Sequence, residues 1–289
     1  MKRNLPLPLA ALFVAGKLLS KAKFFQASAA LQNANRAILR DNGQKPLALK
    51  TLEHSVLSEY GEAGIIDGIF QVIGRKTKKI IEFGFHPTQA NCMNEVLFQK
   101  MDTLFIDASS LSPKVAQQAF RILGRPGIKT LSGFVTVDNV NKLFRDNGFS
   151  GEIDILSIDI DSNDYWVWQA IEVVSPRLVI MEYNDRLGPD LPITIKYDPN
   201  YAPIEASNGF YEGASLAALD KLAKAKGYRL IGCESSGVNA FFLRNDIQAP
   251  QFPTVTVAEA FLYHRRSVAS GLTDEQRRQH IAKFPFVYV

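Results

Sequence analysis

Residues 152–168, EIDILSIDIDSNDYWVW, join a short apolar run to a cluster of acids and then to aromatic residues. The apolar half is rich in β-branched residues and too short for a typical helix, so it predicts a buried strand. Asp159 and Asp161 follow two residues apart at its carboxyl end, and both carboxylates are therefore expected on one face. Open α/β sheets bind their ligands at that edge. A returning helix is expected over Tyr165–Ile171, with capping residues from Ser162, Asn163 and Asp164.

The next apolar run has the same design. Residues 176–184, PRLVIMEYN, predict a second buried strand that ends in Glu182 and Asn184. Two adjacent strands would then direct four polar side chains into one crevice. Acids at strand ends are also common as helix caps or solvated turn residues, but the clustering of four polar groups favours a ligand site.

Strands and helices alternate along the rest of the chain. Apolar runs predict further strands at 78–84, 102–108, 129–135, 228–233 and 238–243, and helical periodicity predicts helices at 52–73, 93–99, 113–123, 137–144 (capped by Asp138) and 214–226. The turn Glu234–Gly237 makes the last two strands a hairpin. This order predicts an α/β fold with a Rossmann-like, mostly parallel seven-stranded sheet and a C-terminal antiparallel hairpin.

Two of these strands end in acids at a spacing that suits a nucleoside. Glu82 and Gly84 end the first strand, and Asp107 ends the second about 24 residues later. A carboxylate at the second position can accept hydrogen bonds from both hydroxyls of a ribose. The spacing therefore predicts a ribose-containing cofactor.

Composition indicates an ordinary globular protein. A hydrophobic share of 46% and a charged share of 21% give no indication of long disorder. Cys92 and Cys233 match no zinc-binding spacing, which argues against a structural zinc or a disulfide framework and fits a reducing compartment. We divide the chain into a basic helical arm (1–50), an α/β domain (51–247) and a partly helical tail (248–289). An irregular insertion at 185–213, rich in proline and aromatic residues, is interpreted as an acceptor-binding lid.

The N-terminal arm carries most of the positive charge. Residues 1–50 hold nine Lys or Arg against Asp41 alone, whereas the body is mildly acidic, so nucleic-acid binding is not expected. Residues 5–15 resemble a signal peptide but contain two prolines and lack a cleavage motif before Lys17. A basic helix with an apolar stripe fits residues 10–40 better, the stripe being Val14, Leu18, Ala22 and Phe25. We expect a cytoplasmic protein whose arm rests on the inner membrane surface, packs on the domain or mediates homo-oligomerisation.

Several segments together resemble the FkbM-type class I S-adenosylmethionine-dependent methyltransferases. The resemblance covers roughly residues 52–245 and is most specific in two places, LSIDIDSNDYWVW (156–168) and GASLAAL (213–219). Weaker matches are SEYGEAGII (58–66), IEFG (81–84), LFID (104–107) and FVTVDNVN (134–141). The resemblance implies a class I methyltransferase fold and transfer of a methyl group to a hydroxyl of a sugar, glycolipid or related metabolite, as in polysaccharide biosynthesis.

The resemblance also assigns roles to individual residues. Cofactor contacts are implied for Glu82, Gly84, Asp107, Asp138, Asn139 and Asp159. Asp161 is the first candidate for the catalytic base, and Asp159 faces the sulfonium and the acceptor. Glu182, Asn184 and Tyr211 are candidates for acceptor binding. Alternatively, Asp161, Glu182 and Asp159 hold a magnesium ion that lowers the pKa of the acceptor hydroxyl.

Two other functions stay open at this point. Asp159-Ile160-Asp161 has the Asp-x-Asp form by which some glycosyltransferases bind a metal and a nucleotide sugar. The loop 85–91 contains no glycine, and Ala63 stands where the family has an acid, so a degenerate fold that serves as a binding or scaffold protein is the non-enzymatic alternative.

Overall fold

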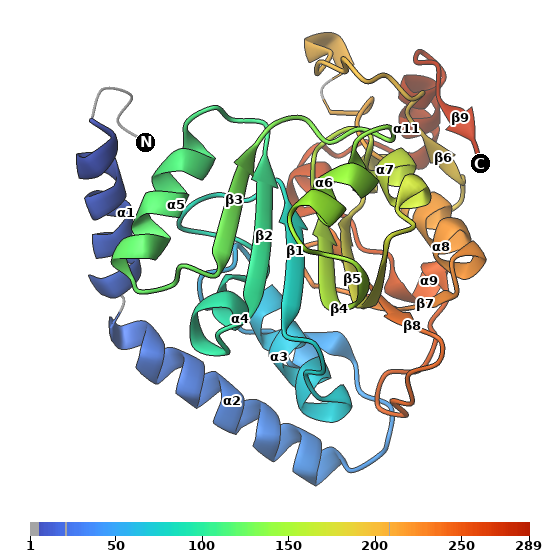
Figure 1. Cartoon of the computed structure of the whole chain (residues 1–289). Helices are drawn as coiled ribbons and strands as arrows, with labels where there is room; N and C mark the ends of the chain where they lie inside the picture. The colour runs from blue at the N-terminus through green and yellow to red at the C-terminus, as the bar shows by residue number, and fades with distance from the viewer. Residues whose placement is uncertain (1–5, 21, 208) are drawn as a thin grey trace.

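A computed structural model describes residues 6–20, 22–207 and 209–289, without the side chains of residues 18–20 and 22–25. Its centre is one seven-stranded sheet in the order β3-β2-β1-β4-β5-β8-β7 (Figure 1). The strands are β1 (Lys79–Phe83), β2 (Asp102–Asp107), β3 (Ile128–Ser132), β4 (Gly151–Ile158), β5 (Val174–Glu182), β7 (Tyr228–Cys233) and β8 (Asn239–Arg244). The first five are parallel, and β8 runs antiparallel to both β5 and β7. The predicted mostly parallel sheet with its closing antiparallel hairpin is thus confirmed.

Helices cover both faces of the sheet because the buried strands are apolar on both sides. One core cluster joins one set of strand side chains to α3 (Glu62–Ile73), α4 (Met93–Phe98) and α5 (Ser112–Ile122). A second cluster joins the other set to α6 (Val140–Asp146), α7 (Asp164–Ala170) and α8 (Leu216–Ala225). This three-layer arrangement places all the carboxyl ends of the parallel strands at one edge of the molecule.

The N-terminal arm forms two helices, α1 (Leu7–Ser20) and α2 (Ala22–Asn42). α1 packs beside α5, and α2 packs on α3 (Figure 1). Val14 of the predicted apolar stripe is buried; the side chains of Leu18, Ala22 and Phe25 lie outside the described residues. Among the helices that the structure describes, none has the length and apolar character needed to cross a bilayer.

Three local expectations were wrong. The helix predicted from residue 52 begins only at Glu62, after the short 3₁₀ turn Leu49–Thr51 and a loop. β3 ends at Ser132 and not near 135. Asp138 does not cap α6: Asn139 precedes the helix, and its side chain accepts from the Thr136 amide (2.9 Å) and donates to the Phe134 carbonyl (2.9 Å), which fixes the preceding loop.

The insertion 185–213 packs against the C-terminal tail. It contains 3₁₀ turns at Asp185–Leu187 and Glu205–Ser207 and the strand β6 (Ile193–Thr194), which pairs with β9 (Val287–Tyr288). The tail also forms α9 (Val257–Ala260), α10 (Arg265–Ala269) and α11 (Asp274–Ile281). Arg277 of the tail is buried, and its guanidinium lies 4.4 Å from the centre of the Tyr263 ring. The tail is therefore part of the folded body.

Candidate active site

The candidate site lies where the strand order changes direction, at the carboxyl ends of β1, β4 and β5. β1 pairs with β2 on one side and with β4 on the other, so the connections after β1 and β4 diverge. Such a switch point opens a crevice in doubly wound sheets. Gly84 follows β1 there with φ +70°, and a Cβ at this position would lie 1.6 Å from the main-chain oxygen of Asp159. Only glycine permits this close approach between the two strand ends.

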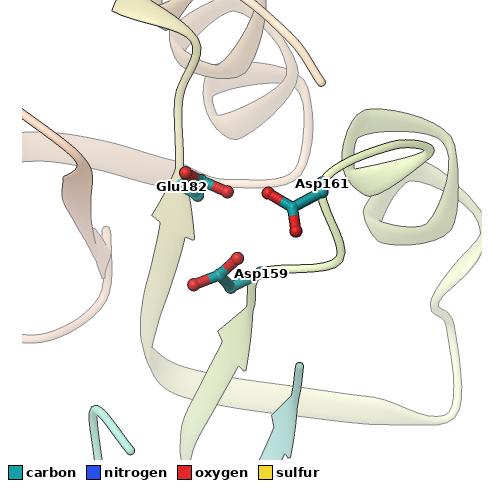
Figure 2. Close-up of side chains that lie close together, drawn as sticks. All are labelled: Asp159, Asp161 and Glu182. Atoms are coloured by element: carbon teal, nitrogen blue, oxygen red, sulfur yellow. The ribbon is translucent and has the colours of Figure 1, made fainter. Parts of the chain in front are cut away.

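Three carboxylates meet above these strand ends. One oxygen each from Asp159, Asp161 and Glu182 lies within 4.8 Å of the other two (Figure 2). Asp154, on the same strand at the opposite edge of the sheet, is very different. Its carboxylate is paired with Arg177 at 3.0 Å and accepts from the backbone amides of residues 76–78. The negative charge of Asp154 is therefore balanced by Arg177 and by backbone amides, as is typical of a structural acid. The three-carboxylate cluster, by contrast, concentrates negative charge.

The electrostatics of the cluster follow from this crowding. Burial, together with the neighbouring charges, raises the pKa of both Asp159 and Glu182 well above the ordinary carboxyl range. Two adjacent carboxyls in this situation retain a proton between them or bind a cation. The cluster is thus suited to proton transfer or to metal binding.

Asp161 is presented by a tightly built turn. Its backbone adopts φ +55°, a left-handed conformation that aspartate tolerates better than most residues. The buried carboxylate of Asp164 accepts from the amides of Ile160 (2.9 Å) and Ser162 (2.9 Å), on either side of Asp161. Asp164, predicted only as a capping residue, therefore holds the Asp161 side chain over the crevice.

Two cavities open from the cluster and share part of their walls. The larger, about 600 Å³, reaches from Tyr60 and Glu62 to the tail, and the smaller, about 320 Å³, extends toward β2 and β3. Gly84, Asp159 and Asp161 line both. A ligand in one cavity would therefore meet a ligand in the other at these residues.

The smaller cavity has the composition of a nucleoside site. Asp107 lies on its wall, and its Oδ1 accepts from the Ser109 amide at 2.8 Å, which fixes the carboxylate. Ile106, Phe134 and Val135 supply an apolar surface nearby. Asp138 and Asn139, expected near the adenine, do not line either cavity.

The glycine-free loop 85–91 is ordered by its own backbone and by Glu82. His86 and Gln89 exchange backbone hydrogen bonds of 3.1 and 3.0 Å. The buried carboxylate of Glu82 accepts from the amides of Asn91 (2.7 Å) and Cys92 (3.0 Å). Glu82 lines neither cavity, so the structure places it beneath the loop.

Burial raises the pKa of Glu82 to about 7, which makes stability dependent on pH. A carboxyl that binds its proton more tightly in the folded state contributes stability below its unfolded pKa near 4.5, and this stability is lost as pH rises through 7. We expect Glu82 alone to lower the free energy of unfolding by about 3 kcal/mol between pH 4.5 and 8. Thermal melts across this range measure the change. Glu82→Gln should make the dependence less steep, and the other buried acids account for what remains. A dependence as steep as in the unmodified protein would contradict the contribution of Glu82.

The insertion reaches both cavities. Tyr201 and Pro199 line the smaller one, and Glu212 and Gly209 line the larger. Asn163, just after the acidic turn, donates to the Asp198 carbonyl at 2.7 Å and so ties the insertion to the site.

The predicted acceptor residues separate into two groups. Glu182 and Asn184 line the larger cavity, and the Asn184 amide donates to the carbonyls of Gly209 and Glu212, each at 2.9 Å. Tyr211 does not line it; its ring stacks on Phe284 and its hydroxyl accepts from the Lys196 amide at 3.3 Å. Tyr211 belongs to a separate hollow of the insertion.

Several residues of the larger cavity were not predicted from the sequence. Buried Glu62 accepts from the Tyr60 amide (2.9 Å) and from the Asn239 side chain (2.9 Å), and burial raises its pKa to about 6. The tail contributes His264 and Arg266. The buried His264 Nε2 has no hydrogen-bond partner among the described residues. The segment 58–66 pointed toward Glu62, but no local pattern indicated His264.

Comparison with known proteins finds matches among solved structures at low sequence identity. No family model matches the chain, and no curated protein does. Among solved structures, the methyltransferase domain of bacterial CtHen1-C is 15% identical, with a TM-score of 0.41 over 63% of this chain and 96% of that one. The N-terminal domain of EvdMO1 with SAH bound is 11% identical, with a TM-score of 0.41 over 72% and 94%. The O-methyltransferase from Bacillus cereus in complex with SAH is 14% identical, with a TM-score of 0.39 over 61% and 76%. The resemblance of the chain to the FkbM-type methyltransferases stays a prediction.

Proposed function

We propose that the protein is an S-adenosylmethionine-dependent O-methyltransferase acting on a hydroxyl of a sugar, glycolipid or related metabolite. The observation that carries this proposal is the pair of cavities that meet at Gly84, Asp159 and Asp161. Group transfer between two ligands requires such a junction, because the reacting atoms must come within about 3–3.5 Å of each other. The acids at the junction supply the proton acceptor that an alcohol needs.

The chain's residues fit the methyl donor on the β2 side of the junction. The fixed carboxylate of Asp107 can accept hydrogen bonds from ribose hydroxyls, and the apolar wall of the smaller cavity suits an adenine. The absence of glycine from loop 85–91 does not leave the loop without structure, because Glu82 holds it. This supports an intact donor site in preference to a degenerate one.

The donor supplies an electrophilic methyl group, and the chain's residues position the acceptor and take its proton. In the proposed step, the acceptor oxygen forms a bond to the methyl carbon as the carbon–sulfur bond breaks and its electron pair remains on sulfur. Asp161 takes the hydroxyl proton, and Asp159 and Glu182 hold the acceptor beside it. Asp161 is the most exposed of the three acids and lines both cavities, which favours it as the base.

A divalent cation is an alternative occupant of the cluster. Three carboxylate oxygens are ligands that magnesium prefers, so Asp159, Asp161 and Glu182 fit such an ion. When bound, it would lower the pKa of an acceptor hydroxyl. Measuring methyl transfer with magnesium and with a chelator distinguishes an essential ion from a cluster that works without one.

The charge of the larger cavity restricts the chemical class of the acceptor. Eight acids line it, against the guanidinium groups of Arg186 and Arg266. Such a wall repels anionic acceptors and accepts hydrogen bonds from hydroxyl groups. This supports a neutral polyhydroxylated acceptor, as a sugar provides.

Asp107 gives a direct test of the donor site. We expect Asp107→Ala to weaken S-adenosylmethionine binding about 10- to 100-fold, because two charge-assisted hydrogen bonds to the ribose are lost. Turnover at saturating donor should change much less, so the effect appears in KM. Asp138→Ala, at an exposed position outside both cavities, is the matched control; equal losses in both variants would contradict this placement of the ribose.

Isotope transfer tests the reaction class. Labelled methyl from S-adenosylmethionine should appear in a hydroxylated acceptor in a screen of sugars and glycolipids. Transfer of labelled sugar from a nucleotide sugar would instead identify the Asp159-x-Asp161 motif as a glycosyltransferase site. Binding of neither donor to the folded protein would favour the scaffold reading.

A further inference from the structure

The outer face of α1 is apolar and exposed. Its inner face packs against the body through Ala10, Ala11 and Val14, which are at most 6% exposed. The opposite face leaves three large side chains 52–54% exposed: Leu9, Leu12 and Phe13. An apolar row of this kind on one helix marks an interaction surface.

The surroundings of this row are positively charged. The first 40 residues contain seven Lys or Arg and no acid. Neither α1 nor its neighbour α5 contains an acidic residue, and Lys17, Lys114 and Arg121 on these helices are exposed. The Lys17 ammonium lies 4.8 Å from the centre of the Phe13 ring, so charge adjoins the apolar row directly. Apolar side chains rimmed by cations are the pattern of a helix that lies in the interface of an anionic membrane.

We propose that α1, with the adjoining exposed edge of α5, docks this protein on an anionic lipid surface. Leu9, Leu12 and Phe13 enter the boundary between headgroups and acyl chains, and Lys17, Lys114 and Arg121 face the lipid phosphates. At 14 residues α1 is too short to span the hydrocarbon core, so it lies along the surface.

The charge distribution favours lipid over a second copy of the chain. A symmetric dimer through α1 would place the same cationic surface on both sides of the contact, and like charges would oppose it. An anionic bilayer satisfies both the apolar and the cationic features at once.

The position of α1 keeps the active site accessible. Figure 1 shows α1 at the edge of the molecule beyond β3 and α5, whereas the insertion and the tail lie on the opposite side. A membrane bound at α1 would therefore leave the insertion uncovered. This inference does not depend on the methyl-transfer proposal.

Co-sedimentation of the full chain with vesicles tests the proposal. One set of vesicles contains equal parts of phosphatidylglycerol and phosphatidylcholine, and the other contains phosphatidylcholine alone. We expect the protein to bind the first and not the second. Leu9→Ser/Leu12→Ser/Phe13→Ser should weaken binding at least about tenfold, since it removes the apolar contact. Lys114→Gln/Arg121→Gln should weaken it to a similar degree, since each cation near an anionic surface contributes about fivefold.

A matched control distinguishes binding through α1 from nonspecific adsorption through other exposed apolar side chains. Ile204→Ser/Val268→Ser removes two comparably exposed apolar side chains from the insertion and the tail and should leave binding unchanged. All substituted positions are exposed, and unchanged melting curves verify the fold. No binding by the unmodified protein, or equal binding by the α1 variant, overturns the proposal. A solution dimer that the α1 substitutions dissolve, without vesicle binding, would assign the face to a second copy.

Discussion

Asp161→Asn is expected to lower kcat by about 10²- to 10⁴-fold, because the amide cannot accept the acceptor's proton. Asparagine has nearly the same size and also tolerates the left-handed backbone found here, φ +55°. The free energy of unfolding should therefore change by less than about 0.5 kcal/mol. Loss of turnover with retained folding would separate a chemical role from a structural one.

Steady-state kinetics measure kcat, and thermal melts on the same preparations measure the change in stability. Asp190→Asn, an exposed aspartate in the insertion that lines neither of the two cavities, is the control and should keep full activity. The Asp161→Asn variant should also keep its affinity for S-adenosylmethionine within a few-fold. An Asp161→Asn enzyme with a near-normal rate would remove this residue from the catalytic role.

Gly84→Ala is expected to destabilise the fold by about 3 kcal/mol or more. The added Cβ would lie 1.6 Å from the Asp159 carbonyl oxygen, and the backbone at this position has φ +70°. A left-handed non-glycine residue costs about 1–2 kcal/mol, and forcing apart two packed strand ends costs about 1–3 kcal/mol more. Because Gly84 lines both cavities, any variant that folds should also bind both ligands poorly.

Chemical denaturation compares this variant with Gly133→Ala. Gly133 lines the same smaller cavity, but a Cβ there meets nothing within 4 Å, so its stability should change little. Similar stabilities for the two variants would show that the strand ends can separate without cost.

The sheet was predictable because each central strand is a short apolar run bounded by polar residues. β4 ends directly before Asp159 and β5 ends at Glu182, as the sequence indicated, and Gly84 is required by the conformation that follows β1. The acidic cluster was predictable for the same reason: parallel strands bring their carboxyl ends to one edge.

The rest of the larger cavity depends on contacts between distant segments. His264 reaches the cavity because the tail packs on the insertion, and its amide donates to Asp185 at 3.0 Å across 79 residues of chain. Glu62 and Asn239 meet across 177 residues. Asp138 was placed by resemblance alone, and the fold leaves it exposed. Local periodicity carries no information about such long-range pairings.

Calorimetric titration with S-adenosylmethionine and S-adenosylhomocysteine, with and without magnesium, tests the central claim most directly. We expect micromolar binding of both ligands, and we expect Asp107→Ala to weaken it. A well-folded sample that binds neither ligand under either condition would contradict the assignment of the smaller cavity as the donor site, and with it the proposed methyl transfer.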